Sequence, residues 1–149
     1  MIDKHMINKR RRARQMALQA LYQWIMTETD LIQIEAEFHE IKNMEKVDTD
    51  YFHELLHQIP QSLTEIDAVF TPYLDRPLTE LNPIELIAIR IATYELAHRI
   101  DIPYKVSINE ALELTKSFGT VAGYKYVNGI VDKVAKQLRP DEKRQANNG

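Results

Sequence analysis

Apolar residues recur at helical spacing along most of this 149-residue chain. Repeats at i, i+3, i+4 and i+7 place apolar side chains on one face of successive amphipathic helices. The pattern predicts seven helices, over residues 9–27, 31–43, 49–59, 62–74, 83–100, 104–118 and 124–138. We therefore expect an all-α fold of about seven helices.

The fifth of these segments has the clearest helix start. Asn82 is a favourable N-cap residue, Pro83 suits the first helical position, and Glu85 stands where it could close a capping box. The sequence that opens at Pro83, PIELIAIRIATYELAHRI, is apolar on nearly every side, so we expect it at the buried centre of the molecule. Pro60 is expected to stop the third helix, and Gly119 the sixth.

The composition agrees with a helical domain. Hydrophobic residues make up 44% of the chain, enough for one sizeable core, while glycine (4) and proline (6) are scarce. We predict a single domain over residues 1–139. Residues 140–149, PDEKRQANNG, are polar and are expected to form a disordered tail.

Several classes of function lack their usual signals in the sequence. Cysteine is absent, which excludes disulfides, thiolate metal ligands and cysteine nucleophiles. The sequence has no run of 18 apolar residues, no signal-peptide core, no glycine-rich phosphate loop and no spacing typical of a Ser-His-Asp triad. We expect a soluble, cytoplasmic protein that is not an enzyme, has no cofactor and does not bind a membrane.

One short motif argues the other way. Residues 53–57 read HELLH, which matches the H-E-x-x-H pattern of zinc peptidases. On a helical wheel His53 and His57 lie away from the apolar face, and the third histidine of the extended motif would fall on Leu63. A downstream acid such as Glu65 could serve as the third ligand, but nothing distinguishes it from other acids. We interpret the motif as two exposed histidines and predict no metal site.

Charge is distributed unevenly, although the net charge is only −3. Residues 1–20 contain six basic residues against Asp3 alone, and residues 28–67 contain eleven acids against Lys42 and Lys46. Five of the cations are concentrated in one six-residue run, Lys9, Arg10, Arg11, Arg12 and Arg14. Such a run can be a solvated helix face. Cations near a helix N-terminus oppose the macrodipole, however, which favours an anionic partner such as a phosphate backbone.

Aromatic residues accompany the cations in two places. Tyr22 falls near Arg11 on the polar side of the first helix, as a contact residue or as a tyrosine lying across the surface. In the last helix Lys125 and Gly129 lie opposite the apolar stripe, with Tyr126 on its flank. Cations interleaved with aromatic rings suit single-stranded RNA, whose bases stack on such rings. A glycine within a helix often marks close approach of another backbone, either in the core or from a partner.

Three segments carry a distinctive combination of residues: KRRRARQMALQALYQW, PYKVSINEALELTKSFG and YKYVNGIVDKVAKQLRP. Together they resemble the NusB family of bacterial transcription factors, N-utilisation substance B, over residues 10–140. The resemblance implies two packed helical bundles, which we place at about residues 9–60 and 61–139. The sequence departs from the family pattern at residues 120–123, TVAG, where family members often carry acids.

The resemblance also implies partners and site residues. Family members pair with NusE, a small-subunit ribosomal protein, bind single-stranded boxA RNA in nascent transcripts, notably of ribosomal RNA operons, and act within the RNA polymerase antitermination complex. The residues that match the family's RNA-contacting positions are Arg10, Arg11, Arg12 and Arg14 near the start of the chain, together with Lys125 and Tyr126. The position of Tyr126 is more often Phe in the family. Tyr22 and Glu85 match positions on the NusE-facing side.

A second hypothesis is a protein-only helical adaptor, in which the basic and acidic segments dock two protein partners without specific RNA binding. A related domain precedes certain ribosomal RNA cytosine methyltransferases, but the chain is too short to include a methyl-donor domain.

Overall fold

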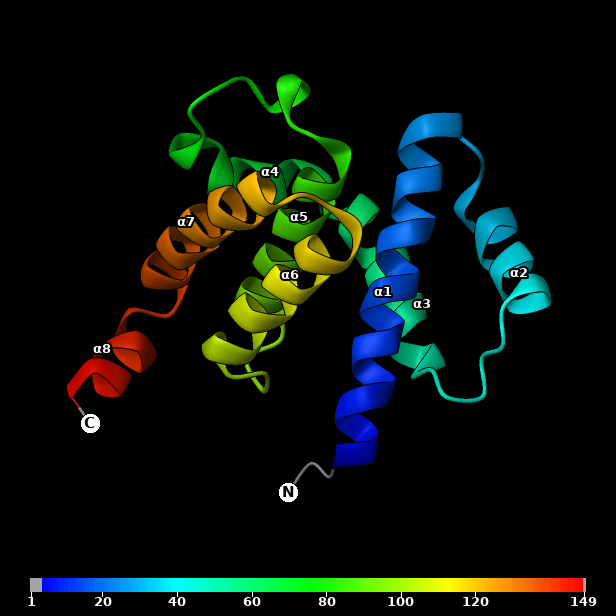
Figure 1. The fold of residues 1–149 in the computed structure, drawn as a ribbon, viewed down its shortest axis with the longest axis horizontal. Helices are drawn as coiled ribbons and strands as arrows, with labels where there is room; N and C mark the ends of the chain where they lie inside the picture. Colours follow the sequence, from blue (N-terminus) through cyan, green and yellow to red (C-terminus); the bar gives the residue numbers. More distant parts are fainter. Residues whose placement is uncertain (1–3, 149) are drawn as a thin grey trace. The chain divides into compact units, whose positions relative to one another are not determined.

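The computed structural model describes residues 4–148, which contain helices and no strand (Figure 1). The predicted all-α class is confirmed. The α-helices are α1 (Lys4–Thr27), α2 (Leu31–Ile41), α3 (Thr49–Gln61), α4 (Leu63–Phe70), α5 (Pro83–His98), α6 (Tyr104–Phe118), α7 (Val121–Leu138) and α8 (Pro140–Asn148). Two 3₁₀ turns, η1 (Thr71–Tyr73) and η2 (Leu78–Glu80), separate α4 from α5. Within residues 4–148, no helix combines the length and the apolar character needed to cross a membrane.

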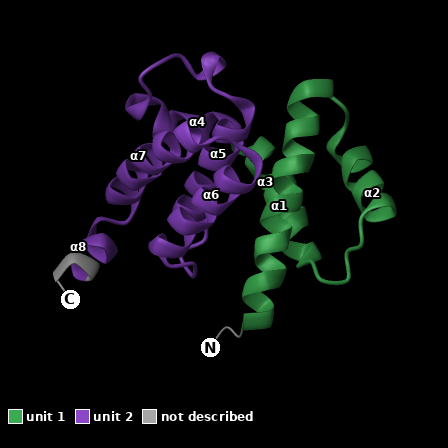
Figure 2. Ribbon diagram, viewed as in Figure 1, with its two compact units in different colours: residues 1–62 green, residues 63–149 purple. Residues whose placement is uncertain are grey.

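The chain divides into two compact units, residues 1–62 and 63–149 (Figure 2). In the first unit α1 packs against both α2 and α3. Alanines on α1 allow close packing, and one face of α3 is buried through Phe52, Leu55 and Ile59. Burying each of these large side chains contributes roughly 1.5–3 kcal/mol. Asp48 begins α3 by accepting a hydrogen bond from the backbone N–H of Tyr51 at 3.0 Å.

The second unit is built around α5. Every residue of α5 from Leu86 to Leu96 is buried, and the helix packs against α4, α6 and α7. This confirms that the apolar segment beginning at Pro83 is central. Asn82 caps the helix as predicted, because its side chain accepts a hydrogen bond from the N–H of Ile84 at 2.8 Å. Arg90 joins α5 to α4 through two parallel bonds to Asp67, of 2.9 and 2.8 Å.

Several helix ends differ from the predicted ones. Pro60 lies inside the last turn of α3, which continues to Gln61, because one missing N–H removes only one bond. The fourth helix ends at Phe70 rather than at residue 74, since Pro72 cannot donate a helical hydrogen bond. The predicted loop at residues 120–123 is largely helical. Thr120 caps α7 by accepting a bond from Gly123 N–H at 3.0 Å.

The polar end of the chain also differs from the prediction of disorder, because residues 140–148 form α8. Glu142 accepts a hydrogen bond from the backbone N–H of Tyr104 at 3.0 Å and pairs with Arg139 at 2.7 Å. Lys143 pairs with Asp132 of α7. Burial opposes ionisation of Glu142, but these partners outweigh it and lower its pKa. Polar composition alone could not reveal these tertiary contacts.

Candidate nucleic-acid interface

The basic segment, which comprises Lys9, Arg10, Arg11, Arg12 and Arg14, lies within α1 and not at its start. The helix already includes Lys4, so the cations occupy its second and third turns. The effect of the macrodipole fades within the first turn. The predicted unfavourable effect of the macrodipole is therefore wrong for the basic segment, and the ability of this segment to bind a partner depends on the exposure of its side chains.

Exposure divides the basic segment into three groups. Arg11 and Arg12 are exposed, Lys9 and Arg10 are half-buried, and Arg14 retains only 3% of its accessible surface. Arg10 and Arg14 are one turn apart, so both face the same neighbour. The two guanidinium carbons lie 5.6 and 5.5 Å from the centroid of the Tyr51 ring on α3. The structure assigns Arg14 to packing, against the prediction that Arg14 grips a phosphate.

Arg10 packs against Tyr51 and is also partly exposed at the surface. Its Nε atom lies 3.8 Å from the carboxylate of Asp48, the residue that caps α3. The backbone carbonyl of Lys9 accepts a hydrogen bond from the Asp48 N–H at 3.1 Å. These contacts fix the start of α3 against α1 and hold the neighbouring Arg11 and Arg12 on a well-supported helix face.

Lys125 and Tyr126 lie on α7 in the second unit, where Lys125 is exposed and Tyr126 half-buried. The segment between η1 and η2 adds a cation that the sequence analysis missed. Arg76 places its guanidinium carbon 4.7 Å from the Tyr126 ring centroid and bonds Asp75 at 2.8 Å. Burial and the neighbouring Asp75 carboxylate raise the pKa of Tyr126, so this ring stays neutral. An isolated Asp-Arg pair in a loop gives no signal in the sequence.

Gly129 follows Lys125 by one turn of α7. An added Cβ there would meet no described atom within 4 Å, and Gly129 is exposed. Close approach of a core helix, one of the two expected explanations, is therefore wrong. The helix surface at Lys125 and Gly129 is exposed, and Gly129 contributes no side chain to it.

The predicted partner-binding residues are placed in different units. Tyr22 lies on α1 with 40% of its surface exposed, as its position on the polar side predicted. Glu85 is half-buried in the first turn of α5. Its Cγ and Cδ atoms would lie 3.1 Å from a Cβ at Gly123. Glu85 thus packs against the first turn of α7, and Gly123 provides the space that this packing needs.

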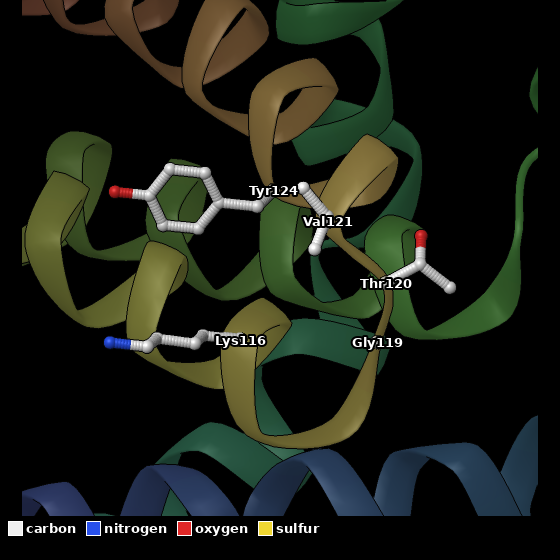
Figure 3. Close-up of a pocket in the computed structure, with 5 residues that line it drawn as sticks. All are labelled: Lys116, Gly119, Thr120, Val121 and Tyr124. Carbon is white, nitrogen blue, oxygen red and sulfur yellow. The ribbon is translucent and has the colours of Figure 1, made fainter.

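A cavity of about 300 Å³ lies where α6 gives way to α7, lined by Lys116, Gly119, Thr120, Val121 and Tyr124 (Figure 3). Figure 3 shows the Lys116 and Tyr124 side chains extending in the same direction from their two helices. A cation beside an aromatic ring suits a nucleotide, because the ring can stack on a base while the amine contacts a phosphate. Lys116 and Tyr124 were not predicted as site residues, although they follow the predicted pattern of cations interleaved with aromatic residues.

The HELLH histidines have a partner that the sequence analysis did not consider. His53 Nδ1 lies 2.7 Å from Glu35 Oε2, and His57 Nε2 lies 2.8 Å from Glu35 Oε1. The prediction that both histidines are exposed holds for His53, whose side chain is 62% exposed. It is wrong for His57, which is 22% exposed because α2 brings Glu35 beside it. Glu35 is one of eleven acids between residues 28 and 67, and nothing in the sequence distinguished it from the others.

Comparisons with known proteins agree with one another. A family model described as the NusB family matches residues 11–136. A transcription antitermination protein NusB of Legionella pneumophila is 52% identical over 141 residues, which cover 95% of this chain and 96% of the relative. A protein of the same description from Pseudomonas fluorescens is 52% identical over 134 residues, covering 90% of this chain and 81% of the relative.

The fold gives the same result. A solved structure of T. maritima NusB superposes with a TM-score of 0.74 at 33% identity, and the match covers 97% of this chain and 99% of that one. The all-α architecture and the exposed cations of α1 and α7 define a small helical protein with basic residues at its surface. The chain belongs to the NusB family, which is non-enzymatic.

Proposed function

We propose that this protein is a transcription antitermination factor that pairs with the ribosomal protein NusE and binds single-stranded boxA-type RNA in nascent transcripts. The printed description of its relatives, transcription antitermination protein NusB, supports this proposal. The observation that carries it is the exposure of Arg11 and Arg12 on α1, at the start of the residues that the family model matches. The protein would act in the cytoplasm, within the RNA polymerase antitermination complex.

In the first unit, Arg11 and Arg12 contact phosphates, with Lys9 and Arg10 contributing from their half-buried positions. Guanidinium groups suit this role because they stay charged and can bond two phosphate oxygens at once. Tyr22, exposed further along α1, contributes to docking NusE. Arg14 supports the segment from beneath by packing on Tyr51.

In the second unit, Lys125 contacts a phosphate while Tyr126 stacks on a base. Arg76 covers one face of the Tyr126 ring, so the base takes the other face and Arg76 adds a cation beside it. Lys116 and Tyr124 extend this surface at the start of α7. Glu85 offers NusE a carboxylate in the first turn of α5. The same side chain also packs against Gly123.

Fluorescence anisotropy tests this function directly. A labelled boxA-like RNA and a scrambled RNA of the same length and composition are titrated with the protein, with and without purified NusE. Preferential binding of the boxA-like RNA, strengthened by NusE, is the expected result. Equal binding of both RNAs under all conditions would favour the protein-only adaptor.

A further inference from the structure

Three side chains from two helices converge in the first unit. Glu35 belongs to α2, and His53 and His57 lie one turn apart on α3. One potential ligand atom from each of the three residues lies within 4.8 Å of the other two. The two imidazole rings are adjacent, with centroids 4.3 Å apart. The proposed function uses none of these residues.

The chemistry of the three groups suits a metal ion of borderline softness. Imidazole nitrogens and a carboxylate oxygen are ligands of Zn²⁺, and three protein ligands leave one coordination position for water. We propose that Glu35, His53 and His57 form a binding site for one divalent transition-metal ion of the Zn²⁺ class. His53 Nδ1, His57 Nε2 and a Glu35 carboxylate oxygen are the ligand atoms.

Tetrahedral coordination requires the three side chains to rotate. Tetrahedral ligands held about 2.0–2.1 Å from Zn²⁺ lie about 3.3 Å from one another. The present contacts of 2.7 and 2.8 Å end on the two different oxygens of Glu35, and the three ligand atoms lie within 4.8 Å of one another, so one oxygen must come to about 3.3 Å from both imidazole nitrogens. Rotation of the side chains supplies this, because His53 is exposed and Glu35 is only partly buried.

Metal binding also depends on the protonation states of the three groups. Burial opposes ionisation of Glu35, but the hydrogen bonds of His57 and His53 outweigh it and lower the Glu35 pKa. In the metal-free chain the imidazole nitrogens that face Glu35 donate these hydrogen bonds, so binding an ion through them requires each ring to move that proton to its other nitrogen or release it to solvent.

The arrangement indicates a clamp and not a peptidase centre. A catalytic zinc works in a shielded cavity, whereas the His53 side chain is 62% exposed. An ion bound by all three groups would tie α2 to α3, replacing two hydrogen bonds with three metal–ligand bonds. The expected consequence is a metal-dependent rise in the stability of the first unit.

The test uses the full-length chain without a polyhistidine tag, stripped of metal with a chelator and then dialysed. Titration with ZnCl₂ in a calorimeter is expected to give saturable binding of one ion per chain, and MgCl₂ to give none, because Mg²⁺ prefers oxygen ligands. At a Zn²⁺ concentration 100-fold above Kd, the Tm should rise by roughly 5–11 °C. Co²⁺ should produce the intense visible absorption of a tetrahedral site.

Single substitutions assign the binding to these residues. His53→Gln, His57→Gln and Glu35→Gln should each lower the Zn²⁺ affinity at least about tenfold. His98→Gln is the matched control, since His98 pairs with Glu65 at 3.7 Å in the second unit without a third ligand within the described residues. His53→Gln is decisive, because so exposed a side chain is dispensable for folding, which circular dichroism verifies.

Two results would overturn the proposal. One is the lack of saturable Zn²⁺ binding by the wild-type chain, which would leave the cluster as a hydrogen-bonded link between α2 and α3. The other is an unchanged Zn²⁺ affinity in all three variants, which would place the ion elsewhere. Neither result bears on RNA binding, so this inference and the proposed function fail or stand separately.

Discussion

The guanidinium carbon of Arg14 lies 5.5 Å from the centroid of the Tyr51 ring, and that of Arg10 lies 5.6 Å from the same ring. One tyrosine of α3 thus takes two of the five cations of the basic segment and leaves Arg11 and Arg12 exposed. Residues that look equivalent in a basic run consequently divide between packing and binding, and substitutions separate the two roles.

Replacing Arg11 and Arg12 together by Ala should weaken RNA binding and leave the free energy of unfolding within about 0.5 kcal/mol of wild type. For single strands, log affinity falls with log salt by about 0.7 per neutralised phosphate, so the slope should flatten by about 1.4. Anisotropy titrations at several salt concentrations measure this slope. An unchanged slope would remove these two arginines from the RNA site.

Arg14→Ala should show the opposite behaviour. Loss of the cation–π contact and of buried packing should lower the free energy of unfolding by about 1–3 kcal/mol. The salt slope of RNA binding should match that of wild type at temperatures where the variant is folded. Urea unfolding gives the first quantity. A flattened slope without loss of stability would return Arg14 to the RNA-contacting set.

Tyr126 offers a test of base stacking. Tyr126→Phe keeps the ring and should leave RNA affinity unchanged, whereas Tyr126→Ala should lose about 1–3 kcal/mol of binding free energy. The hydroxyl is not required, because stacking uses only the ring face. Anisotropy with a boxA-like RNA compares the two variants. Equal affinities for Phe and Ala at this position would exclude stacking.

Gly129→Ala should stabilise the protein. Alanine is the better helix former by about 1 kcal/mol, and the added methyl group meets no described atom within 4 Å. If an RNA backbone approaches α7 at this point, the same methyl group should weaken RNA binding. Urea unfolding and anisotropy measure the two effects. A stabilised variant with wild-type affinity would show that the RNA stays clear of Gly129.

Arg139 should be among the most sensitive positions for stability. Its guanidinium donates to the backbone carbonyls of Glu95, Leu96, Arg99 and Ile102 at 2.9–3.3 Å, at and just beyond the end of α5. Arg139→Ala removes these four bonds, although the Glu95 and Arg99 carbonyls still accept from the backbone N–H groups of Arg99 and Ile102, and should cost about 3 kcal/mol. Arg144→Ala, which breaks an exposed pair with Asp141, should cost about 0.5 kcal/mol or less. Similar losses in the two variants would contradict this account.

Glu35 predicts an acid-dependent contribution to stability. Its pKa is lowered from the ordinary value of 4.5, so the folded state binds a proton on this group less readily than the unfolded state. The stabilisation is present above pH 4.5 and is lost as pH falls through the lower folded-state value. Urea unfolding in metal-free buffer should therefore show a weaker pH dependence below pH 4.5 for Glu35→Gln. An identical pH dependence would rule out this contribution.

The spacing of apolar residues was sufficient to predict a helix and its burial where the local pattern is strong. The apolar segment that follows Pro83 became the buried helix α5, and its cap at Asn82 formed as the local pattern predicted. The predicted helix ends differed from the observed ones where a proline or a capping threonine lies near the end of a helix, as at Pro60 and Thr120. The helical tail after residue 140 depends on Glu142 reaching Tyr104, a partner 38 residues earlier, which local composition could not indicate.

The sequence by itself determined the all-α class, the central helix and the concentration of cations near the start of the chain, because these follow from spacing and composition along a single helix. Only the tertiary structure decided which cations stay at the surface, because Arg10 and Arg14 pack against Tyr51 of α3. It also decided that Glu35 joins two histidines. Contacts between helices depend on which faces pack together, and residues far apart in the chain set that packing.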